Sequence, residues 1–448
     1  MPSRKPRFPG RLTGLLLGFL WLSSAAVSAQ SLIRDAEIEH TLKRIAAPLF
    51  RSAGVGANDI DILVVNDRTL NAFVLNGRAI FLHSGLVTRL KTVEMLQSVI
   101  AHELAHITSG HLVQRALNLG NARSAIGIGL LLSLAASVGG NSDAAAGIAI
   151  GTSGAAINNF LAHTRAEEAV ADQIGVRYMV RAKIDPKAAT DVLEIFRGQE
   201  ALSASRQDAY ARSHPLSQDR IRALKGQIAA HGGAKTVDQT DLVYWHKRMQ
   251  AKFTAFLGNP SYILRHLDNN DTSEAATLTR AIAYHRQGDL KSSMQYMNNL
   301  LAARPDDAYY HELKGQILLE GRNAPAAVAS YRKAGALAPH EPLILAGLGR
   351  ALLSLKTKIG DQQALKVLRR ARDMDARDAR MLRDLAVAWA KSGNNGMASL
   401  VTAERYALLG QFKDAYANAI RAEGLLPRGS AGWLQAEDIA GATKSFAK

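Results

Sequence analysis

The pentapeptide His102-Glu103-Leu104-Ala105-His106 decides how this sequence is interpreted. Apolar residues on either side of it recur every three or four positions, which predicts a helix from Thr92 to Leu112. Residues four apart on a helix share one face, so His102 and His106 can present ring nitrogens to one Zn²⁺. Glu103 projects close to the open coordination position, where it can act as a general base toward water. The stretch therefore predicts a metal site on this helix.

A zinc site of this kind needs a third protein ligand and leaves one position for water. His111 does not fit the metzincin spacing, which would require a histidine at position 112. A second predicted helix, over residues 164–182, carries adjacent carboxylates at Glu167 and Glu168 and can approach the first helix. Spacing alone leaves both carboxylates open as the ligand. Asp172, one turn later, can accept a hydrogen bond from a ligating histidine.

A small sheet is predicted ahead of the first long helix. Ile60 to Val65 is apolar and β-branched, and the segments Asn71–Leu75 and Ala79–Leu82 flank Asn76-Gly77, a strong hairpin signal. Residues 31–52 have the apolar spacing of an amphipathic helix. The fold class predicted for this half of the chain is therefore α+β and mainly helical, a zincin-type domain with a small sheet.

Four features together resemble the zinc metallopeptidase family that contains the CAAX prenyl proteases and the HtpX-type proteases. They are the His-Glu-x-x-His helix, Glu168 and Asp172 with Arg165 ahead of them, Asn71-Ala72-Phe73 in the hairpin, and Ser213-His214-Pro215. The resemblance selects Glu168 over Glu167. It implies one Zn²⁺ per chain on His102, His106 and Glu168, Asp172 behind a ligating histidine, and Glu103 as the catalytic base.

The same resemblance assigns roles around the metal. His214 either occupies the fourth coordination position and holds the resting enzyme inactive, or assists the reaction, and both roles place it near the metal. Asn71, Ala72 and Phe73 belong to an edge strand to which an extended substrate can add a strand. Family analogy gives Arg220 a role in stabilising an oxyanion, whereas His83 and His163 are expected to be structural.

Residues 1–29 have the pattern of a signal peptide: four basic residues, the apolar run Leu15–Leu22, and Val27-Ser28-Ala29. We expect cleavage near Ala29, since the run is shorter than the ~20 residues of a spanning helix, and export to the periplasm, peripheral to the outer membrane. Cysteine is absent, which excludes disulfides, thiolate zinc ligands and a cysteine nucleophile. Removing the four cations lowers the formal charge from +16 to +12, which favours a solvated cationic surface or peripheral membrane contact. No motif for reading bases is present, so no nucleic acid is expected.

The C-terminal part shows a repeat. Gly288 and Gly321 are 33 residues apart and Pro305 and Pro339 are 34 apart, which suits the tetratricopeptide period. The predicted organisation is a signal peptide (1–29), a zinc metallopeptidase domain (30–231), a helical connector (232–270) and an all-α tetratricopeptide solenoid of about four units (271–448). Two apolar stretches, 125–138 and 144–157, are too short to span a bilayer, and fit a buried hairpin, a membrane contact or a flap.

The sequence therefore predicts a metalloendopeptidase. By resemblance, its substrates are unfolded, misfolded or stalled envelope proteins, and it serves quality control of outer-membrane β-barrel assembly, with the repeats docking the assembly machinery. The principal alternative is a chaperone or adaptor that acts through the repeats while the protease stays mostly latent. A third hypothesis, an anionic-surface binder, predicts strong salt sensitivity.

Overall fold

The computed structural model describes residues 32–111, 163–203, 206–231 and 236–446. The predicted signal peptide and the apolar stretches at 125–157 lie outside the described residues. The N-terminal part, residues 32–231, is called the sheet unit below. Its four strands pair in the order β1-β2-β4-β3, with β2 and β4 parallel and the other neighbours antiparallel. They are β1 (Leu32–Ile33), β2 (Asp61–Val65), β3 (Ala72–Asn76) and β4 (Ala79–His83).

The predicted strand and hairpin are confirmed, and the predicted start of the first helix is wrong. The helix expected over residues 31–52 begins only at Ala36, because Leu32 and Ile33 pair with β2 instead. Asp35 caps that helix by accepting a hydrogen bond from the Ile38 amide. Among the described strands, β3 forms one edge of the sheet, and its outer side has no partner strand.

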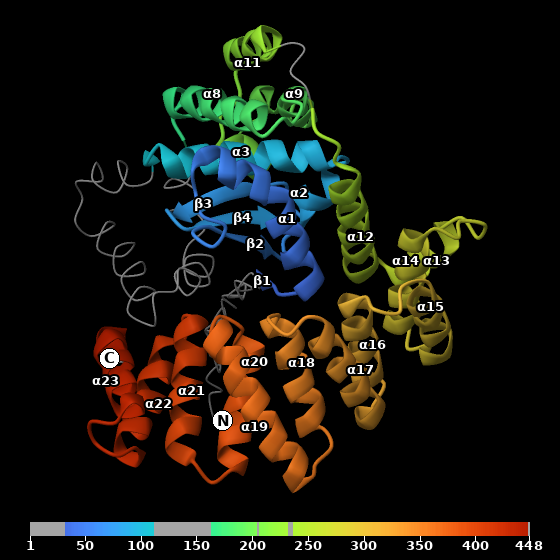
Figure 1. The fold of residues 1–448 in the computed structure, drawn as a ribbon. Helices are drawn as coiled ribbons and strands as arrows, with labels where there is room; N and C mark the ends of the chain where they lie inside the picture. The colour runs from blue at the N-terminus through green and yellow to red at the C-terminus, as the bar shows by residue number, and fades with distance from the viewer. Residues whose placement is uncertain (1–31, 112–162, 204–205, 232–235, 447–448) are drawn as a thin grey trace, which may run out of the picture.

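The central helix α3 lies between the sheet and two further helices, α8 and α9 (Figure 1). Thr92 caps its N-terminus, and it ends at Thr108 rather than at Leu112 as predicted. Gly110, with φ of +66°, turns the chain out of the helix in a conformation that favours glycine. The helices of the sheet unit are α1 (Ala36–Ala53), α2 (Ser84–Arg89), α3 (Val93–Thr108), α8 (Arg165–Arg181), α9 (Lys187–Ile195), α10 (Ala209–Ser213) and α11 (Gln218–Ala230), with a 3₁₀ turn at Gln199–Ala201.

The long helix α12 (Thr240–Leu257) and the short α13 (Pro260–His266) lead into a repeat array, residues 274–446. The sequence predicts about four units, whereas the structure has five successive helix pairs in this fully described range. The units around Gly360 and Gly393 are less regular in the sequence, where no proline marks the turns between residues 343 and 426. The helices are α14 (Glu274–Arg286), α15 (Leu290–Ala303), α16 (Ala308–Glu320), α17 (Ala324–Leu337), α18 (Pro342–Leu353), α19 (Lys358–Met374), α20 (Ala379–Lys391), α21 (Asn395–Leu408), α22 (Phe412–Leu425) and α23 (Ala431–Thr443), followed by a 3₁₀ turn at Lys444–Phe446.

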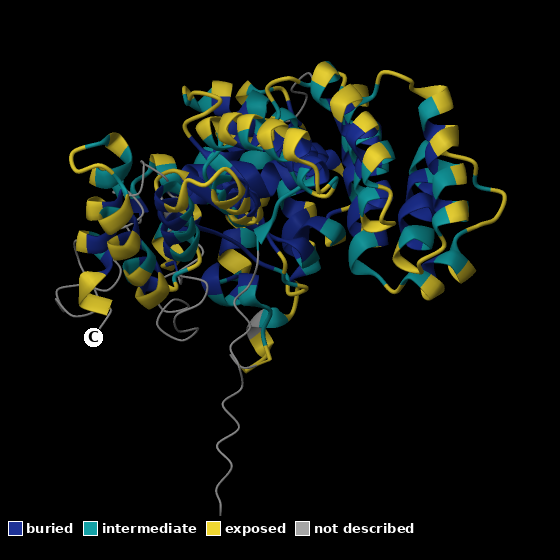
Figure 2. Ribbon diagram, turned by 90° about the horizontal axis from the view of Figure 1, so that it is seen from below, coloured by how far each residue is buried: buried dark blue, intermediate teal, exposed yellow. Residues whose placement is uncertain are grey.

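Small residues let neighbouring helices of the array approach closely. A Cβ atom on Gly315 or Gly347 would lie 2.7 or 2.3 Å from the ring of Tyr331, so both glycines are required for this aromatic side chain to pack. Figure 2 shows the exposed residues on the outer faces of the helices and the buried ones between them. The mainly helical α+β fold with a helical-repeat C-terminus confirms the predicted fold class.

Ion pairs join the sheet unit to the repeat array. Arg34 pairs with Asp375, Asp61 pairs with Arg377, and Arg248 of α12 lies 2.5 Å from both Glu37 and Asp307. None of the helices in the described part of the chain is long and apolar enough to cross a membrane.

Candidate metal centre

Helix α3 presents the two motif histidines on one face, toward the interior of the sheet unit. Their Nε2 atoms lie 3.1 Å apart, and His102 and His106 are 6% and 0% exposed. Glu103 on the adjoining face is fully buried; its carboxylate oxygens accept no hydrogen bond among the described residues, but its Oε1 atom lies 3.3 Å from His214 Nε2. A buried carboxylate whose oxygens accept no hydrogen bond is costly, which marks Glu103 as a group held for chemistry rather than for packing.

Helix α8 brings a carboxylate across these two histidines. Thr164 and Glu167 form a capping box at its start, so Glu167 is occupied with the helix end, while Glu168 points inward. The Glu168 oxygens lie 3.4 Å from His102 Nε2 and 3.2 Å from His106 Nε2. The structure therefore separates the two carboxylates that spacing alone left open.

His214 completes the cluster. It follows α10, is fully buried, and its Nδ1 atom lies 2.9 Å from Glu168 Oε1 and 3.3 Å from His102 Nε2. One ligand atom from each of His102, His106, Glu168 and His214 falls within 4.8 Å of the others. Three imidazole nitrogens and one carboxylate oxygen that converge in this way fit a bound Zn²⁺.

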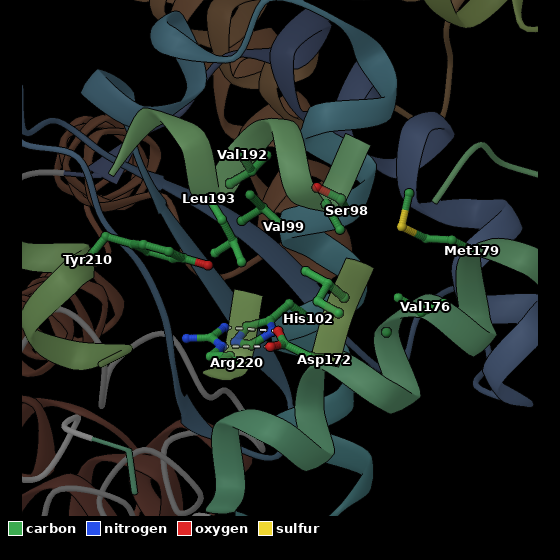
Figure 3. Close-up of a pocket in the computed structure, with 13 residues that line it drawn as sticks. Ser98, Val99, His102, Asp172, Val176, Met179, Val192, Leu193, Tyr210 and Arg220 are labelled. Atoms are coloured by element: carbon green, nitrogen blue, oxygen red, sulfur yellow. Dashed lines mark hydrogen bonds and ion pairs between the residues drawn. The ribbon is translucent and has the colours of Figure 1, made fainter. Parts of the chain in front are cut away.

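A second layer of contacts orients the cluster. Asp172 Oδ1 lies 3.1 Å from His102 Nδ1 and accepts its proton, which leaves the Nε2 lone pair for a metal. Arg220 of α11, 7% exposed, holds both carboxylates of α8, with contacts of 2.6 Å to Glu168 and 2.5 Å to Asp172. Figure 3 shows Arg220, Asp172 and His102 meeting at one end of a small cavity. The oxyanion role expected for Arg220 is wrong for this geometry, because these carboxylates occupy the guanidinium.

The charges of the cluster shift its pKa values in opposite directions. Burial disfavours the charged form of His102, but Glu168 and Asp172 outweigh it and raise its pKa to about 10. Burial lowers the pKa of His106 to about 3, so this ring is neutral. Burial likewise raises the pKa of Glu103, whereas His214 and Arg220 overcome burial and hold the pKa of Glu168 well below its usual range.

The edge strand β3 reaches the cluster through its backbone. The Ala72 carbonyl accepts a hydrogen bond of 3.2 Å from His214 Nε2, and Asn71 Oδ1 accepts one from Ser213 Oγ. The Phe73 side chain is buried and stacks on Phe81, with ring centroids 5.1 Å apart. Of the three substrate-binding candidates, Ala72 and Asn71 therefore face the site, and Phe73 lies in the core.

Two histidines near the cluster were not predicted to contact it. His163, expected to be structural, stacks on His106 with ring centroids 3.7 Å apart. His111 Nδ1 lies 2.9 Å from His106 Nδ1. The sequence signal for His111 is Gly110, whose left-handed conformation returns the chain toward the helix it has just left.

Comparison with known proteins agrees with this site. Residues 33–228 match the model of peptidase family M48. This segment is therefore similar to the peptidases of that family. The β-barrel assembly-enhancing protease of Yersinia pestis is 23% identical over 404 residues, which cover 90% of this chain and 82% of that protein. The predicted resemblance to a metallopeptidase family is thereby confirmed, and the chain is similar to such a protease along most of its length.

Two further matches cover parts of the chain. The mitochondrial metalloendopeptidase OMA1 of Schizosaccharomyces pombe is 29% identical over 195 residues, 42% of this chain and 51% of that protein. A thermophilic TPR protein of Thermus thermophilus aligns with 37% of this chain and 98% of its own, at 16% identity and a TM-score of 0.26.

Proposed function

We propose that this chain is a zinc-dependent endopeptidase of the periplasm that cleaves misfolded or stalled envelope proteins during outer-membrane β-barrel assembly. The observation that carries the proposal is the convergence of His102, His106 and Glu168 beside the buried carboxylate of Glu103. The predicted signal peptide and the name of the Yersinia pestis relative support the compartment and the substrate class.

The residues of the site divide the chemistry among them. His102, His106 and Glu168 would hold the zinc ion, which when bound polarises the scissile carbonyl and acidifies water. Glu103 takes a proton from the attacking water and delivers it to the leaving amine. Its pKa, which burial raises, suits this exchange, because a more basic carboxylate takes up the proton of water more readily. Asp172 and Arg220 keep the ligands in place.

His214 favours a second candidate function, that of an adaptor whose protease is latent. Its Nδ1 atom faces the cluster, at the place where a fourth ligand would exclude water, and its Nε2 atom occupies the Ala72 carbonyl. An added substrate strand would need that carbonyl for pairing. One side chain thus obstructs both the open coordination position and the edge strand in this conformation.

The first experiment measures zinc content and casein degradation by the purified mature chain beside Glu103→Gln and His214→Ala. We expect one zinc per chain, loss of at least 10³-fold activity in Glu103→Gln with zinc retained, and higher activity in His214→Ala. Glu94→Gln, on the same helix but away from the cluster, is the matched control. If every form is inert and free of metal, the peptidase proposal fails and the adaptor becomes the better account.

The substrate class is tested in cells. A strain lacking this protein is complemented with wild type or Glu103→Gln, and the half-life of a β-barrel protein with an assembly defect is followed by pulse-chase. We expect rapid loss of the stalled protein only with wild type. Equal half-lives would remove the quality-control role and leave the peptidase assignment intact.

A further inference from the structure

The ring nitrogen of His106 that points away from the cluster, Nδ1, lies within hydrogen-bond distance of a second histidine. His106 Nε2 faces the cluster, 3.2 Å from Glu168, whereas His106 Nδ1 points away from it, 2.9 Å from His111 Nδ1. His111 is 9% exposed. The two rings meet edge to face, with centroids 5.1 Å apart and an angle of 68° between their planes, an arrangement that brings nitrogen toward nitrogen.

The tautomers of the two rings follow from this geometry. A neutral imidazole carries one proton, and a ring that offers the Nε2 lone pair to a metal keeps its proton on Nδ1. His106 therefore donates from Nδ1, and His111 must accept with its own Nδ1 lone pair. The arrangement parallels that of the other motif histidine, in which His102 donates from Nδ1 to Asp172. The acceptor for His106 is the neutral imidazole of His111, whereas the acceptor for His102 is the carboxylate of Asp172.

A third histidine covers the face of the same ring. His163 stacks on His106 at an angle of 26° between the ring planes. Its backbone amide donates a 2.8 Å hydrogen bond to the Ser213 carbonyl, which ties it to the segment that carries His214. His106 is thus held in direction by one histidine and in plane by another.

We propose that His111 and His163 are positioning residues for the metal ligand His106, with His111 accepting its Nδ1 proton and His163 fixing the plane of its ring. The inference rests on the proposed zinc site. It adds two residues that the motif does not contain, and it explains why Gly110 turns the chain back toward α3.

The same three histidines also satisfy the geometry of a separate metal group, since their ligand atoms lie within 4.8 Å of one another. A second ion there would require His106 to lose its remaining ring proton and bridge two metals as an imidazolate. The hydrogen bond needs no such ionisation, so the positioning role is the simpler account. The two accounts differ in the number of zinc ions per chain.

The test uses the full mature chain and measures zinc affinity by competition with a chromophoric chelator. His111→Leu removes the acceptor, and we expect a 10- to 100-fold loss of affinity, the usual effect of losing such a partner. His111→Asp and His111→Gln supply an acceptor oxygen and should recover most of that loss. His163→Phe keeps the stacked ring and should retain affinity, whereas His163→Ala should lose it in part.

His83→Leu is the matched control, because His83 is a buried histidine bonded to Thr69 outside the cluster. It should leave zinc affinity unchanged even if it lowers the melting temperature. In addition, the visible spectrum of the Co²⁺-substituted protein should shift in His111→Leu and return in His111→Asp, a change that a general loss of stability would not produce.

Three outcomes would overturn the inference. Equal zinc affinity in His111→Leu and wild type would remove the role of His111. A stoichiometry of two in wild type that falls to one in His111→Leu would identify a second metal site instead. A wild type that binds no zinc would defeat the proposed function as well, whereas a zinc-loaded wild type with an unaltered His111→Leu would defeat this inference alone.

Discussion

At the scale of single residues, Arg220 shows how much of the site depends on groups outside the zinc-binding motif. It is the cation that compensates two buried carboxylates, Glu168 and Asp172. Removing one partner from a buried ion pair leaves an uncompensated charge, which costs about 3–5 kcal/mol. A bound metal would offset part of that cost by taking over the charge of Glu168.

We therefore expect Arg220→Met to lower the free energy of unfolding of the metal-free protein by about 3 kcal/mol, and zinc to restore part of it. Urea denaturation with and without zinc measures both effects. Arg222→Met, two residues later on the same helix, changes a side chain that is 74% exposed and should have almost no effect. Equal losses in the two variants would contradict the role given to Arg220.

The sequence predicts the candidate ligands well but not the residues that orient them. His102, Glu103 and His106 lie within one helical turn, so their spacing alone specifies a common face. Arg220 and His163 reach the cluster from segments far along the chain. No local sequence pattern distinguishes them from the arginines and histidines that lie on the surface. Asp172 could be predicted from the sequence because it lies one turn from Glu168 on the same helix.

At the scale of elements, the edge strand β3 has two distinct sides. Asn71 and Phe73 direct their backbone groups toward β4, as the hydrogen bond from the His83 amide to the Asn71 carbonyl and the pairing of Phe73 with Phe81 show. Ala72 and Val74 therefore direct theirs outward, where a substrate strand would pair.

Proline at Val74 and at Phe73 removes an outward amide in the first case and a ladder amide in the second, and both replaced side chains are buried. Val74→Pro removes an outward amide, so we expect a drop of at least tenfold in kcat/KM for an unfolded protein substrate, with zinc affinity retained. Phe73→Pro removes an amide that β4 uses and should destabilise the sheet. Kinetics on casein and melting temperatures of both variants test this contrast. Full activity in Val74→Pro would show that substrates do not add to this edge.

Local signals predicted the individual elements better than their arrangement. Asn76-Gly77 specified the hairpin, and Thr164 with Glu167 specified the start of α8. The sheet order could not be predicted for two reasons. β2 pairs in parallel with β4, although β3 lies between them in the sequence, and β1 consists of two residues only. Such pairings depend on tertiary packing rather than on neighbouring residues.

At the scale of the whole molecule, several carboxylates gather around one lysine at the junction between the sheet unit and the repeat array. Glu312 of α16 is half-buried near Asp35, Glu37 and Glu341, with Lys252 as the opposing cation. Burial and the neighbouring carboxylates outweigh Lys252 and raise the pKa of Glu312 to about 8. The folded protein thus retains a proton on Glu312 in a range where the unfolded chain has lost it.

The raised pKa of Glu312 determines whether the stability of the folded protein rises or falls with pH. Between the ordinary glutamate pKa near 4.5 and the folded value near 8, the folded state binds more protons, so stability falls as pH rises through that window. Glu312→Gln removes the titration, and we expect it to raise the melting temperature at pH 9 by roughly 2 °C or more and to change it little at pH 5. Glu320→Gln, in the same helix but paired with His285, is the control. A pH-independent effect of Glu312→Gln would contradict the assignment.

Two further ion pairs determine how the repeat array sits against the sheet unit. Arg34 with Asp375 and Asp61 with Arg377 converge on the loop between α19 and α20, and Asp61 and Arg377 also line a hollow of about 1000 Å³ between the two parts. Asp375 is 7% exposed, and its burial is overcome by Arg34 and Arg377, which hold its pKa well below the usual range. These contacts join the sheet unit to the loop between α19 and α20, beyond the part of the array where Ala36 packs with Ile344.

The combined variant Asp61→Asn and Asp375→Asn removes both charges while keeping side-chain size. We expect faster amide exchange at residues 372–379 and a larger radius of gyration by small-angle scattering, because both ion pairs that hold this loop against the sheet unit are lost. Zinc affinity should not change, since every candidate ligand belongs to the sheet unit. Asp361→Asn, which breaks an exposed pair with Lys391 inside the array, is the control and should move neither measurement. Unaltered exchange in the double variant would mean that apolar packing, not charge, sets the position of the repeats over the peptidase domain.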